Sequence, residues 1–163
     1  MKQRSEPELL HLAAAYCSTA ERCIQEVQKK IISQGGTPEI SKRIISYLIK
    51  EKFIDESRYS RSFVNDKFRF NQWGRIRISY ELQKKGIASQ LFADALDNIN
   101  EEEYMETLSK LLINKKRSTK GHSEQDIFNK LYRFAAGRGF ESQIIIKCLK
   151  PLFKQHYDAG DLE

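Results

Sequence analysis

A glycine followed five residues later by an aliphatic residue recurs three times along this chain of 163 residues. The copies stand about 50 residues apart, and apolar residues occupy matched positions before and after each glycine. Self-similarity at this period indicates one supersecondary unit copied along the chain, and a unit of this size buries too little apolar surface to be stable alone. The three copies are Gly35 to Ile40, Gly86 to Leu91 and Gly139 to Ile144.

Helix signals surround the first glycine. The segment Ser18-Thr19-Ala20-Glu21 has the form of a capping box, which predicts the start of a helix. Ile24, Val27 and Ile31 then follow at steps of three and four and form one apolar stripe, which Gly35 ends. Pro38 favours a second helix directly after the turn, because proline loses no hydrogen bond in a first helical turn.

Similar signals continue along the chain. Asp55 is predicted to cap a helix with Phe63 facing inward, and Leu82 is predicted to lie in the core of the next unit. Residues 115–123 are polar and contain a glycine, which favours a loop before a helix capped by Ser123.

One segment carries a conflicting pattern. From Arg75 to Leu82 polar and apolar residues alternate, which is typical of a β-strand. The matching segments of the other copies have helical spacing, and a single strand would have no partner for its backbone hydrogen bonds. We therefore predict a helix here as well.

These patterns predict an all-α fold, an elongated tandem array of three-helix units with the third unit shortened. The predicted parts are an N-terminal helical extension at 1–17, repeats at 18–70, 71–117 and 118–152, and an acidic tail at 153–163. Such an array offers long faces, which suit binding better than catalysis.

The sequence contains no motif that would indicate an enzyme. It has no glycine-rich phosphate loop, no G-x-S-x-G and no H-E-x-x-H. Its three cysteines form no C-x-x-C pair and its three histidines are scattered. We expect no catalytic residues, no metal and no cofactor.

The sequence also lacks a membrane signal. No apolar run approaches the roughly 18 residues that span a bilayer. Glu6 and Glu8 stand where a signal peptide would be basic. We expect a cytoplasmic protein that does not enter a membrane.

The net charge of +6 is distributed in blocks of one sign. Residues 56–86 hold 8 basic and 3 acidic side chains, residues 87–114 hold 1 and 6, and residues 115–150 hold 9 and 3. Blocks of this kind are often only a solvated surface, but they also suit the binding of a polyanion.

A three-helix unit also suggests a helix-turn-helix reader of DNA. That function needs a second helix with Arg, Asn or Gln facing the bases. The corresponding segment here carries Asp94 and Asp97, which repel phosphate, and the positive charge lies on the preceding helix. The pattern favours contact with a phosphate backbone over the reading of sequence.

Three segments of the chain resemble a known family, the regulatory protein RecX. They are Ile54-Asp55-Glu56-Ser57-Arg58-Tyr59-Ser60 with Phe63-Val64, then Trp73-Gly74-Arg75-Ile76-Arg77-Ile78 with Glu81 to Ile87, and finally Arg138-Gly139-Phe140. The resemblance covers roughly residues 16–150. Ile54, Glu56 and Tyr59 depart from the family's leucine, aspartate and phenylalanine but keep size or charge.

The resemblance implies a non-enzymatic modulator of the RecA recombinase. Such a protein binds along the groove of the RecA filament on single-stranded DNA and inhibits the recombinase, ATPase and coprotease activities, which modulates DNA repair and the SOS response. Direct contact with single-stranded DNA and a monomeric state are further expectations. The alternative is a general nucleic-acid-binding helical module that acts through its basic patches without a recombinase.

Two sets of residues follow from this reading. Arg58 is expected to pair with Asp55, and Arg75 and Lys85 are expected to face solvent. The residues expected to contact the partner or DNA are Lys67, Arg69, Arg75, Arg77, Lys84, Lys85, Arg133 and Arg138. The residues expected to maintain the fold are Asp55, Arg58, Phe63, Gly74, Leu82, Gly86 and Gly139.

Overall fold

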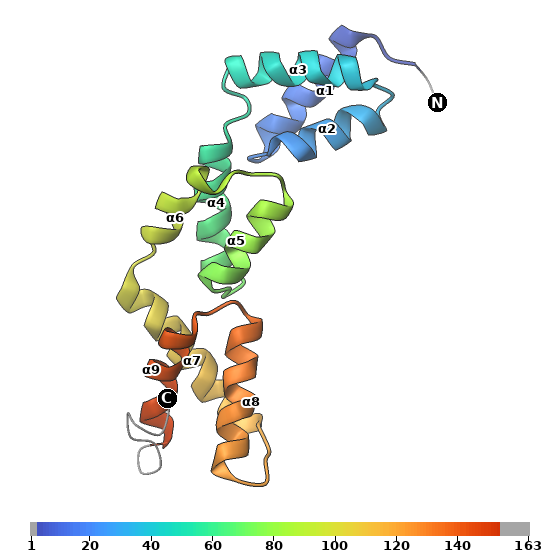
Figure 1. Cartoon of the computed structure of the whole chain (residues 1–163). Coiled ribbons are helices and arrows are strands. Elements are labelled where there is room, and N and C mark those ends of the chain that lie inside the picture. The colour runs from blue at the N-terminus through green and yellow to red at the C-terminus, as the bar shows by residue number, and fades with distance from the viewer. Residues whose placement is uncertain (1–2, 154–163) are drawn as a thin grey trace. The chain divides into compact units, whose positions relative to one another are not determined.

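The computed structural model describes residues 3–153, and every regular element in that range is helical (Figure 1). The predicted acidic tail lies outside this range except for Phe153. The segment 75–84 is a helix, as predicted against its strand-like alternation. The helices are α1 (Glu6–Thr19), α2 (Ile24–Ser33), α3 (Pro38–Lys50), α4 (Glu56–Arg69), α5 (Arg75–Lys84), η1 (Ser89–Leu91), α6 (Ala93–Asp97), α7 (Glu101–Ser118), α8 (Glu124–Gly137), α9 (Ser142–Leu149) and η2 (Lys150–Phe153).

The chain divides into two compact units. Unit 1 comprises residues 1–64 and 81–95, and unit 2 comprises residues 65–80 and 96–163. In unit 1, α1, α2 and α3 pack against one another in pairs, and in unit 2 the same holds for α7, α8 and α9. Each unit therefore contains a complete three-helix bundle with its own apolar core.

The core of the first bundle is aliphatic. Thr37 caps α3 by accepting a hydrogen bond from the backbone N–H of Ile40, and Pro38 occupies the first turn as predicted. The stripe predicted for α2 points into this core. The buried residues that form it are Leu9, Ala13, Val27, Ile31, Ile44, Ile45, Leu48 and Ile54.

The predicted capping box at 18–21 is wrong. Ser18 and Thr19 belong to the end of α1, where their hydroxyls donate to the carbonyls of Ala14 and Tyr16. Helix α2 instead starts after Cys23, whose backbone N–H donates to the Glu26 side chain at 3.0 Å. A serine hydroxyl can satisfy a free carbonyl at a helix end as well as a free amide at a helix start, so the motif alone does not fix direction.

The predicted cap of α4 is confirmed, but its predicted ion pair is not. Asp55 Oδ1 accepts hydrogen bonds from the backbone N–H groups of Ser57 and Arg58, both at 3.0 Å. The Arg58 guanidinium pairs with Glu21 at 2.6 Å rather than with Asp55. Arg58 thus ties the start of α4 to the segment before α2. Leu82 is fully buried, as predicted for a core position.

Aromatic rings contact one another in the core of unit 2. The Tyr104 ring lies 5.6 Å from that of Phe68 and 5.1 Å from that of Phe140, measured between centroids. Helix α7, which carries Tyr104, starts at the Asn100 cap and continues to Ser118. The predicted loop at 115–123 is therefore helical in its first four residues, because the lysines of the last turn are favourable at a helix C-terminus.

Two glycines bring the α4–α5 connection against the α8–α9 turn within unit 2. Gly74 N–H donates to the Arg138 carbonyl at 2.8 Å, and Ile76 N–H donates to the Gly139 carbonyl at 2.9 Å. Gly139 has φ +93°, and a Cβ atom there would lie 2.5 Å from the backbone nitrogen of Arg77. Both the left-handed conformation and the close approach require glycine.

We expect Gly139→Ala to lower the free energy of unfolding by at least about 2 kcal/mol, because it adds backbone strain and a steric overlap. Gly137 offers a matched control: it ends α8, and a Cβ there meets nothing within 4 Å. Gly137→Ala should be neutral or stabilise by up to about 1 kcal/mol. Urea unfolding of both variants measures the difference, and equal midpoints would contradict the assigned role of Gly139.

Candidate functional site

The side chains of two predicted contact residues lie over one tryptophan in unit 2, and a third lies beside the backbone that precedes it. The guanidinium carbon of Arg77 lies 4.1 Å from the centroid of the Trp73 ring, and Lys67 Nζ lies 5.1 Å from it. Arg138 follows the last residue of α8, and its guanidinium carbon lies 5.7 Å from the ring centroid of Phe134. We call Lys67, Trp73, Arg77, Phe134 and Arg138 the Trp73 cluster.

The local backbone explains why these side chains meet. Trp73 N–H donates to the carbonyl of Lys67 at 3.0 Å, which places the indole directly after α4. Gln72 adopts a left-handed conformation with φ +57°, so the chain turns sharply before α5. Arg77 then lies in the first turn of α5.

Arg138 is held at the edge of the cluster by its own hydrogen bonds. Its guanidinium donates to the carbonyl oxygens of Asn71 at 2.5 Å and of Gln72 at 3.3 Å. Burial and then the positive charge of Arg77 lower the pKa of Arg138. Two guanidinium groups that repel each other at a fixed position favour a bound anion, because an anion offsets the repulsion of both.

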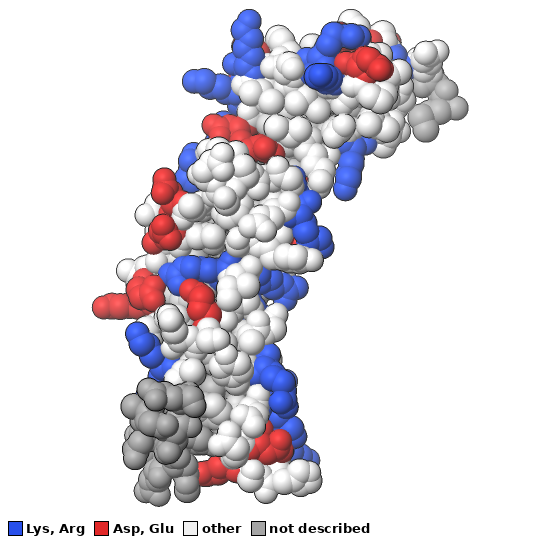
Figure 2. All heavy atoms as spheres, in the orientation of Figure 1, with Lys and Arg blue, Asp and Glu red and all other residues white. Residues whose placement is uncertain are grey.

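Further basic residues continue along α8 in unit 2. Figure 2 shows Lys and Arg side chains along the edge of the surface over α8. Arg133 is exposed on this helix, and so is Lys130, which forms an ion pair with Asp126 at 3.4 Å. Lys115 Nζ of α7 lies 5.1 Å from the Phe134 ring. The α8 edge is therefore a basic extension of the Trp73 cluster.

Unit 2 also carries exposed apolar side chains in the segment from the end of α4 to α5. Phe70 keeps 80% of its surface exposed, Tyr80 keeps 59% and Ile76 keeps 57%. Ile76 and Tyr80 are four residues apart on α5 and share one face of the helix. Neither Trp73 nor Phe70 is among the predicted contact residues, although basic residues interleaved with aromatic ones were a signal by which both could have been found.

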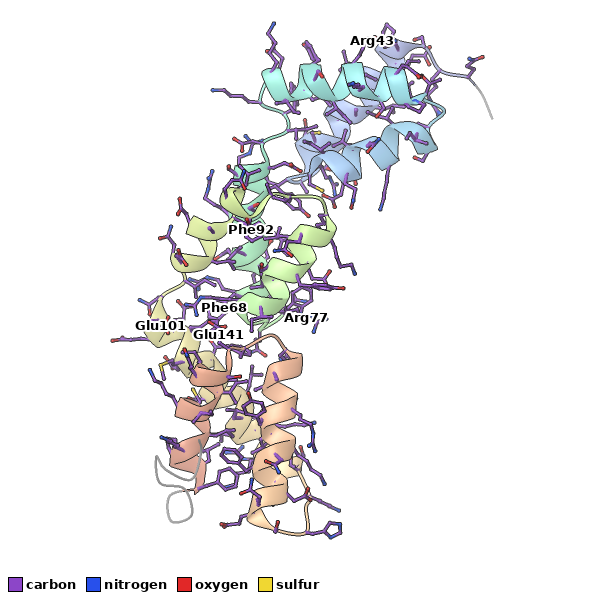
Figure 3. All side chains as sticks on the ribbon, in the orientation of Figure 1. Arg43, Phe68, Arg77, Phe92, Glu101 and Glu141 are labelled. Carbon is purple, nitrogen blue, oxygen red and sulfur yellow. The ribbon has the colours of Figure 1, made fainter. Side chains whose placement is uncertain are left out.

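The prediction that Arg75 faces solvent is wrong. Its side chain is only 18% exposed, and its guanidinium pairs with Glu101 and Glu141, both at 2.8 Å. Its guanidinium carbon lies 4.0 Å from the centroid of the Tyr104 ring, and its backbone N–H donates to the Tyr104 hydroxyl at 2.9 Å. Figure 3 shows Glu101 and Glu141 to the left of Arg77 in that view.

The pKa values of this network reflect its ion pairs. Burial would lower the pKa of Arg75, but hydrogen bonds to Glu141 and Glu101 outweigh it and raise the pKa. Burial and the hydrogen bond to Glu141 raise the pKa of Tyr104. The Tyr104 hydroxyl therefore stays protonated and donates to Glu141 while it accepts from the Arg75 backbone. We assign Arg75 to the fold of unit 2.

The remaining predicted contact residues are placed less favourably. Arg69 pairs with Glu103 at 3.0 Å in unit 2. Lys85 belongs to unit 1, where its ammonium lies 3.9 Å from Glu26, and its side chain is only 28% exposed. Lys84, also in unit 1, is exposed, and its carbonyl accepts from Gln25 at 3.4 Å. The predicted solvent-facing position of Lys85 is therefore wrong.

Two further features bear on the class of site. In the described residues no three side chains among His, Cys, Asp and Glu are placed so that they could hold a metal ion. In the same part of the chain no helix combines the length and apolar character that a membrane crossing needs. What the described surface offers is charge and aromatic area.

We expect Arg75→Ala to lower the free energy of unfolding by about 1 to 3 kcal/mol, because it leaves Glu141 without its cation. The loss should stay below that of a fully buried pair, since Glu101 is 58% exposed. Arg133→Ala is the matched control on an exposed position and should change stability by less than about 0.5 kcal/mol. Urea unfolding curves that coincide for the two variants would contradict the structural role assigned to Arg75.

Two models of one family match the chain. The second three-helix domain of RecX matches residues 55–96, and the third three-helix domain of RecX matches residues 101–149. These ranges hold α4 to α6 and α7 to α9, which confirms the all-α fold and the three-helix unit. The second and third predicted repeats, at 71–117 and 118–152, begin one helix later than the two matched domains. The boundaries of all three repeats, including the first at 18–70, stay a prediction.

Curated relatives carry the same family name. The regulatory protein RecX of Clostridium acetobutylicum is 30% identical over 139 residues, which cover 81% of this chain and 63% of that protein. The regulatory protein RecX of Lactobacillus johnsonii is 27% identical over 143 residues, 88% of this chain and 53% of that protein. The chain thus spans between half and two thirds of the length of these relatives.

Two crystal structures share the fold. RecX from Lactobacillus salivarius has a TM-score of 0.78 at 24% identity, over 91% of this chain and 97% of that one. A second crystal structure of regulatory protein RecX has a TM-score of 0.81 at 22% identity, over 88% and 70%. At these identities the structures show the fold alone. The family itself is shown by the two domain models, which together match more than half of the chain. The chain belongs to the RecX family of regulatory proteins.

Proposed function

We propose that this protein is a non-enzymatic regulator that binds the RecA recombinase filament on single-stranded DNA. Binding would inhibit the recombinase, ATPase and coprotease activities and so modulate DNA repair and the SOS response in the cytoplasm. The single observation that supports this function is the match of two consecutive three-helix domains of the RecX family to residues 55–96 and 101–149. The protein would act as a monomer and without a cofactor.

The Trp73 cluster supports the nucleic-acid part of the proposal. Lys67, Arg77 and Arg138 supply positive charge beside two aromatic rings, and Arg133 continues the charge along α8. Cations that follow a phosphate backbone and rings on which bases stack are the usual components of single-strand binding. We propose these four cations as the DNA contacts, with Lys84 as a further candidate in unit 1.

A second function is favoured by the same surface. A general nucleic-acid-binding module would use the Trp73 cluster and the α8 edge in the same way but would need no recombinase. Its affinity for single-stranded DNA would be the same with and without RecA. The two functions therefore differ in whether RecA changes the binding.

The ATPase activity of RecA tests the proposed regulator function. Adding the protein to RecA on single-stranded DNA should suppress ATP hydrolysis at substoichiometric to equimolar amounts, because bound regulator would block filament extension. A coupled ATPase assay at fixed RecA and DNA measures the effect. An unchanged rate up to equimolar protein, with filament length unchanged in electron micrographs, would remove RecA as the partner.

The second prediction concerns the basic surface. Arg77→Gln with Arg133→Gln should make the slope of log K against log[salt] shallower by about 1 to 2 for single-stranded DNA, because two phosphate contacts are lost. Lys29→Gln with Lys42→Gln is the matched control, since both lysines are exposed in unit 1 and the charge change is equal. Equal slopes for the two double variants would show that the Trp73 cluster and the α8 edge do not contact DNA.

A further inference from the structure

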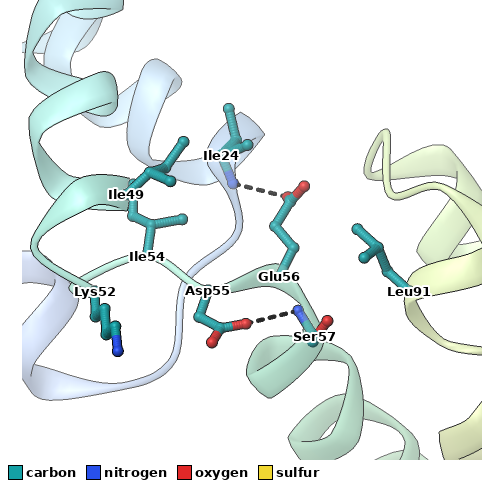
Figure 4. Close-up of a pocket in the computed structure, with 8 residues that line it drawn as sticks. All are labelled: Ile24, Ile49, Lys52, Ile54, Asp55, Glu56, Ser57 and Leu91. Carbon is teal, nitrogen blue, oxygen red and sulfur yellow. Dashed lines mark hydrogen bonds between the residues drawn. The ribbon is translucent and has the colours of Figure 1, made fainter.

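A recess of about 400 Å³ opens in unit 1, where the first turn of α4 meets the start of α2 and the η1 turn (Figure 4). Its apolar lining consists of Ile24, Ile49, Ile54 and Leu91. Ile54 is buried, but Ile49 and Leu91 keep 44% and 38% of their surface exposed. The volume is at the low end for ligand pockets, which suits one or two side chains better than a large cofactor.

The carboxylate of Glu56 stands inside this apolar lining. Its Oε2 accepts a hydrogen bond from the Ile24 backbone N–H at 3.1 Å, and Figure 4 shows the carboxylate between Ile24 and Leu91. Burial raises the pKa of Glu56, and the hydrogen bond from Ile24 only partly opposes this. A cation that entered the recess would stabilise the ionised form of this half-buried carboxylate.

The other charged residues of the recess leave it acidic. Asp55 Oδ1 accepts the backbone N–H groups of Arg58 and Ser57, and these bonds lower the pKa of Asp55 and keep it ionised. Lys52 is the one cation among the residues that line the recess, and it is exposed at the rim. The guanidinium of Arg58 is turned to Glu21 and to the carbonyl of Lys52.

This combination narrows the possible occupants. A phosphate group would be repelled by two carboxylates. A purely apolar side chain would cover Glu56 without compensating its charge, which costs free energy. Lysine and arginine combine an aliphatic stem with a cationic head, so they match both parts of the lining.

We propose that the recess receives a lysine or arginine side chain of the protein partner, with the stem against Ile49 and Leu91 and the cation beside Glu56. This contact rests on the proposed function, which makes the recombinase the partner. It assigns to unit 1 a protein contact that differs in charge from the DNA contact proposed for unit 2.

The first experiment removes both features of the recess. Glu56→Gln keeps an oxygen that can accept the Ile24 N–H, and Leu91→Ala removes exposed apolar surface, so the double variant should fold. Its affinity for RecA filaments on single-stranded DNA should fall about tenfold or more, and its affinity for bare single-stranded DNA should be unchanged. Biolayer interferometry on immobilised filaments and on bare DNA measures both, with thermal unfolding as the check on folding.

A matched control changes one glutamate and one aliphatic residue outside the recess. Glu39→Gln with Ile32→Ala alters an exposed acid and an exposed isoleucine in unit 1 and should bind filaments like the unaltered chain. If the recess variant also binds filaments like the unaltered chain, the recess proposal is overturned and the proposed function stands. An unaltered chain with no affinity for filaments would overturn both, and an equal loss on bare DNA would make nucleic acid the occupant.

The second experiment tests the chemistry of the occupant. Lysine and arginine residues on the surface of RecA are replaced singly by glutamine, and filaments of each variant are titrated with the unaltered chain and with Glu56→Gln. One RecA replacement should weaken the unaltered chain severalfold and leave Glu56→Gln unaffected, because both changes break the same contact. Coupling to none of them would overturn a cationic occupant.

Discussion

The backbone contact between Gly74 and Gly139 is the constraint on which unit 2 depends. Two hydrogen bonds cross this contact, and neither glycine leaves room for a Cβ atom. The neighbouring network of Arg75 with Glu141 then pairs charges that would be costly to bury apart. Backbone fit and charge compensation thus act on the same few residues, so a change in either affects the packing of α5 against the α8–α9 turn.

The same contact also positions the candidate site. Arg77 follows Gly74 by three residues, and Arg138 directly precedes Gly139. The contact between the glycines therefore brings the two guanidinium groups near each other although like charges repel. The fold tolerates their mutual repulsion because each cation has stabilising contacts of its own. Arg77 lies over the Trp73 ring, and Arg138 lies near the Phe134 ring and donates to a backbone carbonyl. A surface that holds like charges together in this way is prepared for an anionic partner.

Sequence patterns predicted the fold and many residues of the candidate site, but they did not predict the ion pairs. The Asp55 cap depends on neighbours close in sequence, so it could be predicted locally. The helix at 75–84 could be predicted only by comparison with the matching segments of the other glycine copies, because its own pattern is strand-like. A period does not say where a repeat begins, so the second and third predicted repeats start one helix later than the two matched RecX domains. Arg75 looked like any exposed helical cation because Glu141 and Tyr104, which bury it, are distant in sequence.

The two proposed contacts have opposite charge requirements, and this limits what the partner can be. The Trp73 cluster would attract phosphate, whereas the recess beside Glu56 would repel phosphate and accept a cationic side chain. Bare nucleic acid could satisfy only the first contact, and an ordinary basic protein only the second. A nucleoprotein filament presents both phosphates and protein cations, so a chain with both surfaces would bind it better than either component alone, through two linked contacts.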